Sequence, residues 1–296
     1  MNLQDRFRGS LVGLACGDAV GATLEFRPRG TFTPLTDMVG GGVVGKAGEW
    51  TDDTILALCL ANSLIEKGFD PADQMKKYSD CVYKGYIHPT IQKWIGIATS
   101  DAIFRHYTTG EALSGSTDPR KSGNGSLMRL CPVPMYCYPD LATTVINSAI
   151  SSKTTHSSLT CIEACMLFGE MLHKAFSGES KESILFNTVT PVSHPEMVSL
   201  KQGTYKDKTD RQIRGTGYVV ASLEASLWCF LKTSNFRDAI LMAANLGDDA
   251  DTTAAITGQI AGAFYGYEGI PQSWKDKLDR EAEISNLAIV LCGDKQ

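Results

Sequence analysis

The chain has 296 residues, 43% of them hydrophobic, and a formal net charge of −5 at pH 7. That apolar content can fill one large core, so we expect a single domain over residues 1–296. Lys and Arg are dispersed along the chain, which excludes a dedicated nucleic-acid-binding protein, because such proteins carry a basic stripe for the phosphate backbone.

The first ten residues carry charges where a secretory signal has its apolar segment, and nowhere do eighteen apolar residues follow one another. We therefore expect a soluble, cytoplasmic and monomeric protein without a membrane partner. The nine cysteines form no C-x-x-C pair, and most of them lie inside apolar helical patterns. This usage indicates reduced thiols in the core.

The first predicted helix carries glycines at a regular interval. They are Gly9, Gly13, Gly17 and Gly21. Glycine inside a helix costs about 1 kcal/mol relative to alanine, so a packing gain must offset it. A four-residue period places these glycines on one helix face, where another helix can come close. Ala254, Gly258 and Gly262 repeat the spacing, and we expect the two helices to lie deep in the bundle against each other.

The stretch GGGVVGKAGEWTDDT, residues 40–54, supports two interpretations. Its first part has the G-x-x-x-x-G-K spacing of a phosphate-binding P-loop. However, Ala47 stands where that loop needs Ser or Thr, and no apolar strand precedes it. We therefore predict an ordinary glycine-rich loop, which leaves the acidic end of the stretch as the candidate site.

Apolar residues recur at helical spacing through the rest of the chain. The predicted helices are residues 52–66, 157–175, 218–232, 236–245 and 252–265. Gly, Pro and polar clusters separate them, notably at residues 27–50, 110–125 and 199–216, and no comparable series of strands or internal repeat occurs. The sequence therefore predicts an all-α fold.

Two acidic clusters mark the starts of predicted helices almost two hundred residues apart. They are Thr51-Asp52-Asp53 and Asp249-Ala250-Asp251-Thr252. Each cluster alone fits a helix cap, because Thr and Asp are favoured there and acids complement the helix dipole. If the clusters meet in a buried site, their four carboxylates need cations to offset repulsion and desolvation. Oxygen ligands favour Mg²⁺ or Mn²⁺ over zinc, and a pair of ions suits this number of carboxylates.

Taken together, these segments resemble the ADP-ribosylglycohydrolase family, particularly its bacterial members of the dinitrogenase reductase-activating glycohydrolase type. The similar segments are GLACGDAVGATLEF (13–26), GEWTDDT (48–54), GNGSLMR (123–129), TTHSS (154–158), GTGYVVASLEASLW (215–228) and NLGDDADTTAAITGQIAGAFYG (245–266). The resemblance covers nearly the whole chain. It implies a single-domain orthogonal helix bundle with a dinuclear magnesium centre.

The resemblance also implies which residues form the site. Its metal ligands would be Thr51, Asp52, Asp53, Asp249, Asp251 and Thr252. Glu25 is similar to the family's glutamate beside the scissile ribose and, with Asp52 and Asp53, is a candidate catalytic carboxylate. Asp18 is expected to be buried behind the ligands. Asp248 departs from the family pattern and could be either a solvated bystander or a further acid behind the ligands.

A second set of residues would bind the organic part of the ligand. By the same resemblance it comprises Gly123, Asn124, Gly125, Ser126, His156, Gly217 and Tyr218. The glycine loop would take the phosphates and inner ribose, and the segment at Tyr218 the adenosine end. Each residue also has a structural alternative, since glycines make turns, a histidine can be a hydrogen-bonded core residue and an aromatic ring can simply pack.

The implied function is magnesium-dependent removal of ADP-ribose from a modified protein side chain, with arginine as the first expectation. The ions would fix the distal ribose for attack by water, and ADP-ribose would be the product. Two alternatives stay open: a metal-dependent phosphoester hydrolase, and a protein that binds ADP-ribose without cleaving it. The general base, Glu25 or one of the metal-linked aspartates, is also left open.

Overall fold

A computed structural model describes residues 1–89, 91–293 and 295, and within them regular secondary structure is helical apart from two isolated β-bridges. The α-helices are α1 (Leu3–Gly21), α2 (Asp52–Lys67), α3 (Pro71–Lys84), α4 (Ile97–Thr109), α5 (Pro132–Cys137), α6 (Leu141–Thr155), α7 (Leu159–Phe176), α8 (Lys181–Phe186), α9 (Pro195–Lys201), α10 (Val219–Lys232), α11 (Phe236–Ala244), α12 (Ala250–Tyr265), α13 (Gln272–Lys277) and α14 (Glu281–Cys292). Short 3₁₀ helices are η1 (Ile91–Lys93), η2 (Pro119–Lys121), η3 (Thr204–Asp207), η4 (Asp210–Gln212) and η5 (Tyr267–Gly269). The all-α prediction is confirmed.

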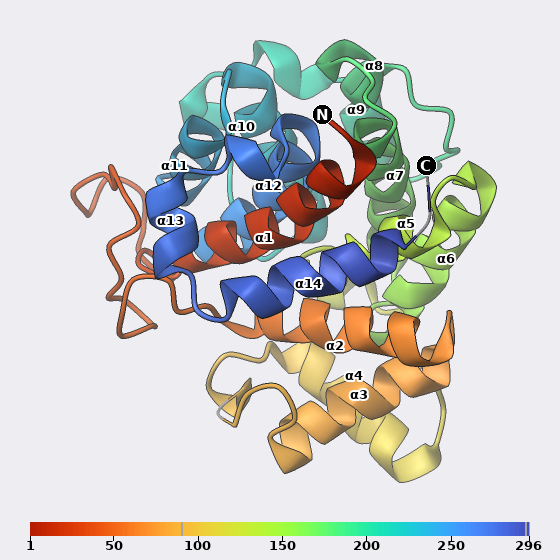
Figure 1. The fold of residues 1–296 in the computed structure, drawn as a ribbon. Coiled ribbons are helices and arrows are strands. Elements are labelled where there is room, and N and C mark those ends of the chain that lie inside the picture. Colours follow the sequence, from red (N-terminus) through yellow and green to blue (C-terminus); the bar gives the residue numbers. More distant parts are fainter. Residues whose placement is uncertain (90, 294, 296) are drawn as a thin grey trace.

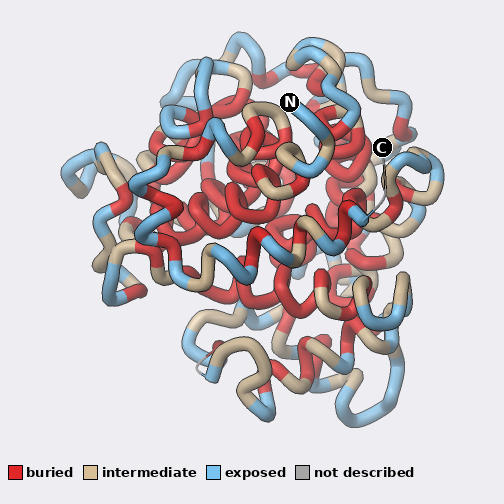
Figure 2. The backbone as a smooth tube through the Cα atoms, in the orientation of Figure 1, coloured by how far each residue is buried: buried red, intermediate tan, exposed pale blue. Residues whose placement is uncertain are grey.

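Helices α1 and α12 pack against each other in the interior of the fold (Figure 1). A Cβ atom on Gly13 would lie 2.5 Å from the carbonyl oxygen of Gly258, and one on Gly258 would lie 2.0 Å from that of Gly13. Gly9 faces Gly262, so the two helices run antiparallel with matched four-residue steps. The predicted pairing of the two small-residue stripes is confirmed, and every residue from 9 to 21 is buried (Figure 2).

This pairing brings two distant parts of the chain to one corner of the molecule. Gly21, at the end of α1, contacts Ala250 and Asp251, at the start of α12. The start of α2 joins them there, because the backbone N–H groups of Thr51 and Thr54 both donate to Asp18 of α1, at 3.0 Å each. Three helix ends therefore meet where the two acidic clusters lie.

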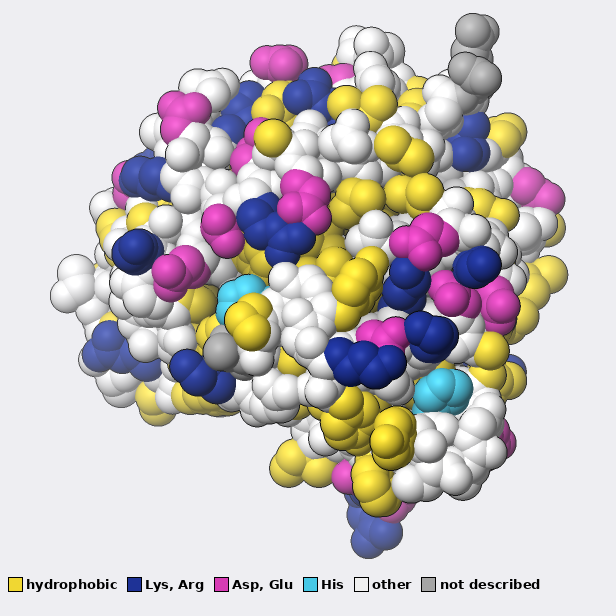
Figure 3. Space-filling view, turned by 60° about the horizontal axis from the view of Figure 1, so that its bottom comes forward, with side chains coloured by type: hydrophobic (Ala, Val, Ile, Leu, Met, Phe, Trp, Pro, Cys, Tyr) yellow, Lys and Arg dark blue, Asp and Glu magenta, His cyan; other side chains and the backbone are white. Residues whose placement is uncertain are grey.

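The glycine-striped first helix corresponds to α1, and the five helices predicted with bounds correspond to α2, α7, α10, α11 and α12, with ends shifted by no more than two residues. Residues 27–50 contain no helix, whereas the segment at 199–216 holds the end of α9 and two 3₁₀ turns. All nine cysteines are free and buried, as predicted. None of the described helices has the length and apolarity needed to cross a membrane. On the face drawn in Figure 3, Lys and Arg side chains alternate with Asp and Glu side chains.

Candidate metal and ligand site

A cavity of about 550 Å³ opens at the corner where the three helix ends meet. Most of the predicted site residues line it: Glu25, Asp52, Asp53, Gly123, Asn124, Gly125, His156, Gly217, Asp249, Asp251 and Thr252. The acidic residues occupy one part of its wall, and the glycine loop with His156 occupies another. This volume lies in the range of cavities that hold small organic ligands.

Asp18 holds the start of α2 in place from behind the cavity. It is fully buried, and it accepts hydrogen bonds from the hydroxyls of Thr51, at 3.0 Å, and Thr54, at 2.6 Å, besides their backbone N–H groups. The N-cap residue of α2, Thr51, makes no capping bond with its own side chain. A carboxylate from α1 therefore does the capping, which leaves the acids of α2 free for another role. The expected position of Asp18 is confirmed.

The acidic clusters of α2 and α12 come together in the interior. Thr51 Oγ1 lies 3.4 Å from Asp53 Oδ2 and 3.5 Å from Asp251 Oδ2. Thr252 Oγ1 lies 3.4 Å from the same Asp53 oxygen. The side chain of Asp249, at the N-cap of α12, likewise makes no capping bond. Capping of its own helix therefore does not explain why Thr51 stands at the start of α2 or why Asp249 stands at the start of α12.

The donor set fits a hard cation. Thr51 has one hydroxyl proton, and its nearest acceptor is Asp18, at 3.0 Å against 3.4 Å for Asp53 and 3.5 Å for Asp251. The hydroxyl lone pairs therefore face the carboxylates of Asp53 and Asp251. Asp53 Oδ1 is buried without a hydrogen-bond partner. No group of three or more His, Cys, Asp or Glu side chains in the described part of the chain is arranged so that these side chains alone could hold a metal ion. Any ion here would therefore need the threonine hydroxyls as well as the carboxylates, an all-oxygen set that suits Mg²⁺ or Mn²⁺.

Burial raises the carboxyl pKa values throughout this cluster. It raises the pKa of Asp18 to about 6 and, with repulsion from Asp18, the pKa of Asp52 to about 7. The pKa values of Asp53 and Asp251 are also raised well above the usual range, first by burial and then by neighbouring acids. None of the ion pairs among the described residues involves these acids. The cluster needs protons or cations to offset its charge.

The loop after α1 places Glu25 at the cavity. Phe26 N–H donates to the carbonyl of Asp248 at 2.7 Å, and Asp248 N–H donates to the carbonyl of Arg27 at 2.9 Å. Phe26 and Asp248 have φ angles of 61° and 57°. Such left-handed backbone favours glycine and is more readily adopted by aspartate than by most other residues. The backbone of Asp248 therefore holds the loop after α1 in place, and Asp248 lines the cavity as well.

The glycine loop is tied both to the segment before α10 and to the acids. Asn124 N–H donates to the carbonyl of Gly217 at 3.1 Å. Its side-chain Nδ2 donates to Asp249 Oδ2 at 2.6 Å and to Ser222 Oγ at 3.1 Å. A Cβ atom on Gly125 would lie only 2.9 Å from the His156 ring, so glycine is needed where the ring covers the loop.

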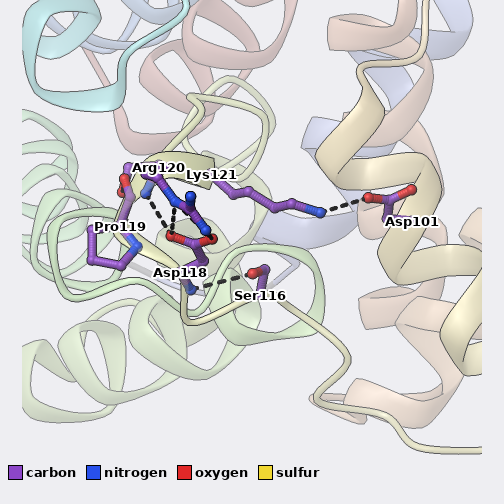
Figure 4. A network of polar contacts seen from close by, with 7 residues as sticks. Asp101, Ser116, Asp118, Pro119, Arg120 and Lys121 are labelled. Carbon is purple, nitrogen blue, oxygen red and sulfur yellow. Dashed lines mark hydrogen bonds and ion pairs between the residues drawn. The ribbon is translucent and has the colours of Figure 1, made fainter.

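Three predicted residues lie off this cavity. Thr51 lies behind the acids, and the hydroxyl of Ser126 is paired with that of Ser152 in the core, at 2.9 Å. Tyr218 lines an adjoining cavity of about 380 Å³ together with Arg120 and Lys121. Both of these cations are already paired, Arg120 with Asp118 and Lys121 with Asp101 of α4 (Figure 4). The network fastens η2, just before the glycine loop, to α4.

The cavity has further walls that sequence reasoning missed. They include Trp94, Ile97, Thr99, Met128 and Thr216. Met128 and Thr216 lie inside the family-like segments 123–129 and 215–228. For Trp94 and Ile97 the available signal is the pattern W-I-G-I-A before and into α4, which is equally typical of core residues. Ile97 is 80% exposed, so its side chain stands at the rim.

A helix bundle with buried carboxylates and threonine hydroxyls beside a ligand-sized cavity agrees with the expected family. Residues 1–295 match the sequence profile of the ADP-ribosylglycohydrolase family, and the chain belongs to that family. It is accordingly a hydrolase of the ADP-ribosylglycohydrolase class.

Individual relatives give closer comparisons. ADP-ribosylarginine hydrolase Tri1 of Serratia proteamaculans is 41% identical over 290 residues, which cover 96% of this chain and 78% of that protein. ADP-ribosyl-[dinitrogen reductase] glycohydrolase of Rhodospirillum rubrum is 30% identical over 95% of this chain and 93% of its own length. A solved structure described as an ADP-ribosylglycohydrolase-related protein complex superposes with a TM-score of 0.86 at 36% identity, covering 98% of both chains.

Proposed function

We propose that this protein is a magnesium-dependent ADP-ribosylarginine hydrolase that releases ADP-ribose from modified arginine side chains of proteins. The observation that carries this proposal is the buried set of carboxylates and threonine hydroxyls, without a basic partner among the described residues, at the wall of the 550 Å³ cavity. The similarity to proteins named as ADP-ribosylarginine hydrolases supports the choice of arginine.

The two acidic clusters would hold the ions. Their oxygens come from Thr51, Asp52 and Asp53 on α2, and from Asp249, Asp251 and Thr252 on α12. Bound Mg²⁺ supplies Lewis acidity and fixed positive charge beside the reacting sugar. The protein buries these oxygens, and burial keeps bulk water from competing with them for the ions.

The ligand would extend from the acids to the glycine loop. The distal ribose of ADP-ribose would lie against Glu25 and the acids, with its pyrophosphate along residues 123–125 beside His156. The backbone N–H groups of Gly123 and Asn124 already donate to the carbonyls of Lys121 and Gly217, which leaves that of Gly125 to donate to a phosphate oxygen. Tyr218, in the adjoining cavity, would face the adenosine end.

The reaction would be a hydrolysis at the anomeric carbon of the distal ribose. A water oxygen bonds to that carbon while the bond from carbon to the guanidine nitrogen breaks, and the electron pair of that bond stays on the nitrogen. One proton leaves the water for a carboxylate and one reaches the departing guanidine, so that ADP-ribose and arginine are formed. Glu25 is the carboxylate we assign to the proton transfer, because it lines the cavity and its Oε2 has no hydrogen-bond partner.

Incubation with arginine-linked and serine-linked ADP-ribosyl peptides, with Mg²⁺ or with EDTA, tests this proposal. We expect release of ADP-ribose from the arginine-linked peptide only, abolition by EDTA and restoration by added Mg²⁺. Full turnover by metal-free protein would contradict the metal centre. Tight binding of ADP-ribose without release would indicate a binding protein, and release of AMP or phosphate would indicate a phosphoester hydrolase.

A further inference from the structure

Arg129, three residues after the glycine loop, is a buried cation without an acidic partner. Its side chain is 1% exposed, and none of the ion pairs among the described residues includes it. Its guanidinium lies 4.8 Å above the ring of Tyr78 and donates to the Tyr78 hydroxyl at 3.0 Å. Burying an arginine without a carboxylate is costly, so its remaining contacts are informative.

Those contacts reach the ligand cavity from behind. One guanidinium nitrogen, Nη1, donates to the carbonyl oxygen of Gly125 in the glycine loop, at 2.5 Å. The other, Nη2, donates to the hydroxyl oxygen of Thr155 at 2.7 Å. Thr155 Oγ1 in turn lies 2.9 Å from Nδ1 of His156, whose ring lines the cavity. One cation thus fixes both the loop and the residue beside the histidine.

The direction of these hydrogen bonds follows from the donors available. Arginine has only N–H donors, so the Thr155 oxygen accepts from it. The hydroxyl has one proton, and within the described residues Nδ1 of His156 is its one acceptor. This proton has an acceptor only if Thr155 donates to Nδ1, and Nδ1 is then the unprotonated nitrogen of a neutral ring. Burial first, and then Arg129, lowers the pKa of His156 to about 3, which agrees with a neutral ring.

The ring proton consequently sits on Nε2, on the side of the glycine loop. A Cβ atom on Gly123 would lie 3.4 Å from Nε2, and one on Gly125 3.3 Å from it. Nε2 is therefore next to the loop backbone, where a ligand oxygen would lie. We propose that Arg129 and Thr155 are positioning residues that hold His156 as its Nε2–H tautomer, a fixed hydrogen-bond donor to a phosphate or ribose oxygen at the glycine loop. The identity of this ligand rests on the proposed function.

The tautomer can be measured directly in the free protein. Two-bond ¹H–¹⁵N correlation spectra distinguish the two neutral tautomers from the imidazolium, and the chain has five histidines. The His156→Gln variant identifies the His156 signals. We expect a single Nε2–H tautomer at about pH 7, with Nδ1 shifted as a hydrogen-bond acceptor. A wild-type His156 that is protonated, or protonated on Nδ1, overturns the proposal.

Substitutions of Thr155 separate a positioning role from a merely structural one. In Thr155→Val the hydrogen-bond shift of Nδ1 should be lost and the affinity for ADP-ribose, measured by calorimetry, should fall about five- to tenfold, as expected when one hydrogen bond is removed. Thr155→Ser should restore both. Unchanged Nδ1 shift and affinity in Thr155→Val, or lost affinity with an unchanged shift, overturns the proposal.

Thr144→Val is the matched control. Thr144 is a buried threonine on the same helix, and its hydroxyl lies 3.5 Å from Nδ1 of a histidine that does not line the cavity, His173. This change should leave the His156 signals and the affinity for ADP-ribose within twofold of wild type. Arg129→Lys should reproduce the spectral change of Thr155→Val. If Arg129→Lys does not fold, the comparison of Thr155→Val with Thr155→Ser tests the proposal by itself.

Failure of this proposal differs from failure of the proposed function. The tautomer is read without substrate, so a single Nε2–H signal in a protein that releases no ADP-ribose contradicts only the hydrolase assignment. Normal release of ADP-ribose by a protein whose His156 carries its proton on Nδ1 contradicts only the positioning role.

Discussion

At the scale of single residues, the proton of the Thr51 hydroxyl decides what that side chain can bind. Asp18 accepts the hydrogen bond of this hydroxyl from inside the fold, and the lone pairs of the hydroxyl oxygen are left facing two buried carboxylates. A threonine whose proton pointed outward would serve as a donor and could not ligate a cation. The buried aspartate of α1 thus sets the chemistry of a residue on α2.

Asp251→Asn tests whether the second cluster binds metal. Asparagine has nearly the same shape and caps helices as well as aspartate, so a capping role predicts little change. A ligand role predicts that ADP-ribose release falls by at least about a hundredfold, because the charge that holds the ion and orients the ribose is reduced. Helical circular dichroism should stay at the wild-type level. Release rates at saturating Mg²⁺ provide the measurement.

Asp238→Asn is the matched control for that change. Asp238 is also an acid in the first turn of a helix, α11, but it is exposed and does not line the cavity. We expect its loss to leave release within twofold of wild type. Near-normal turnover and magnesium affinity in Asp251→Asn would show that Asp251 is not a ligand.

At the scale of helices, Gly13→Ala has two opposite effects on stability, one from helix propensity and one from packing. Propensity alone would stabilise α1 by about 1 kcal/mol. The new Cβ atom, however, would lie 2.5 Å from a backbone carbonyl oxygen of α12, which cannot rotate away. Overpacking of this kind costs about 1–3 kcal/mol or more. We expect a net decrease in the free energy of unfolding, measured by urea denaturation, together with weaker magnesium binding because Asp18 moves with α1.

Gly169→Ala on α7 provides the comparison for Gly13→Ala. Its nearest neighbour would be a side-chain hydroxyl, Oγ of Ser148, at 2.4 Å, which can change rotamer. This variant should lose less stability than Gly13→Ala. A Gly13→Ala protein more stable than wild type would mean that the close contact between the two helices is absent in solution.

Lys46→Ala tests the loop that imitates a P-loop. The backbone N–H groups of Gly45 and Lys46 donate to the carboxylate of Glu49, at 2.8 and 3.0 Å. A carboxylate of the chain thus occupies the amides that a P-loop would offer to phosphate. We expect release of ADP-ribose within a few-fold of wild type and no ATP binding by calorimetry. ATP affinity that depends on Lys46 would reverse this interpretation.

A helix could be predicted from the sequence where the residues that stabilise it lie within that helix, and not where it depends on contacts with distant residues. The stripes on α1 and α12 predict the central pair because each stripe is complete within one helix. Helix α6 is not predicted, since its sequence LATTVINSAISSKTT is rich in Ser and Thr, which have low helix propensity. Its N-cap Asp140 and buried hydroxyl contacts, such as Thr144 to the Asp140 carbonyl, stabilise it instead.

The same distinction applies to the site. The acidic clusters are visible in the sequence because Asp and Thr occur next to one another at helix starts. The walls formed by Trp94 and Ile97 are not, because their position depends on how η1 and α4 pack against α3. The off-cavity position of Ser126 has the same origin: its hydroxyl pairs with a residue of α6, a helix that the sequence does not predict.

At the scale of the whole molecule, a cation bound between the clusters would connect α2 and α12 in the native state only. Saturation at a hundred times the dissociation constant would then stabilise the fold by about 2.7 kcal/mol. For a protein of this size we expect the melting temperature in Mg²⁺ to exceed that in EDTA by roughly 5 °C. Asp251→Asn should show a much smaller difference, and its metal-free form should melt above the metal-free wild type.

The metal-free protein should also become less stable as pH rises. The native pKa values of Asp18, Asp52 and Glu25 are raised to about 6, 7 and 8, mainly by burial. Groups with raised native pKa values bind protons more tightly when folded, so their stabilising contribution, complete below about pH 4, is lost as pH rises through 6 to 8. Scanning calorimetry in EDTA should show a lower melting temperature at pH 8 than at pH 6, and saturating Mg²⁺ should reduce that difference. An equal pH dependence with and without Mg²⁺ would mean that the ion does not bind at these acids.

The pairing of α1 with α12 has a consequence for the order in which the protein is made. Helix α1 ends at Gly21, and α12 begins only at Ala250. At synthesis rates of about 5–20 residues per second, the first helix waits roughly ten to fifty seconds for the surface that buries its glycine face. During this interval the nascent chain exposes an apolar helix that chaperones can bind. The acids of α2 gain their partners on α12 only afterwards, so a cation cannot guide the first steps of folding and joins a bundle that is already assembling.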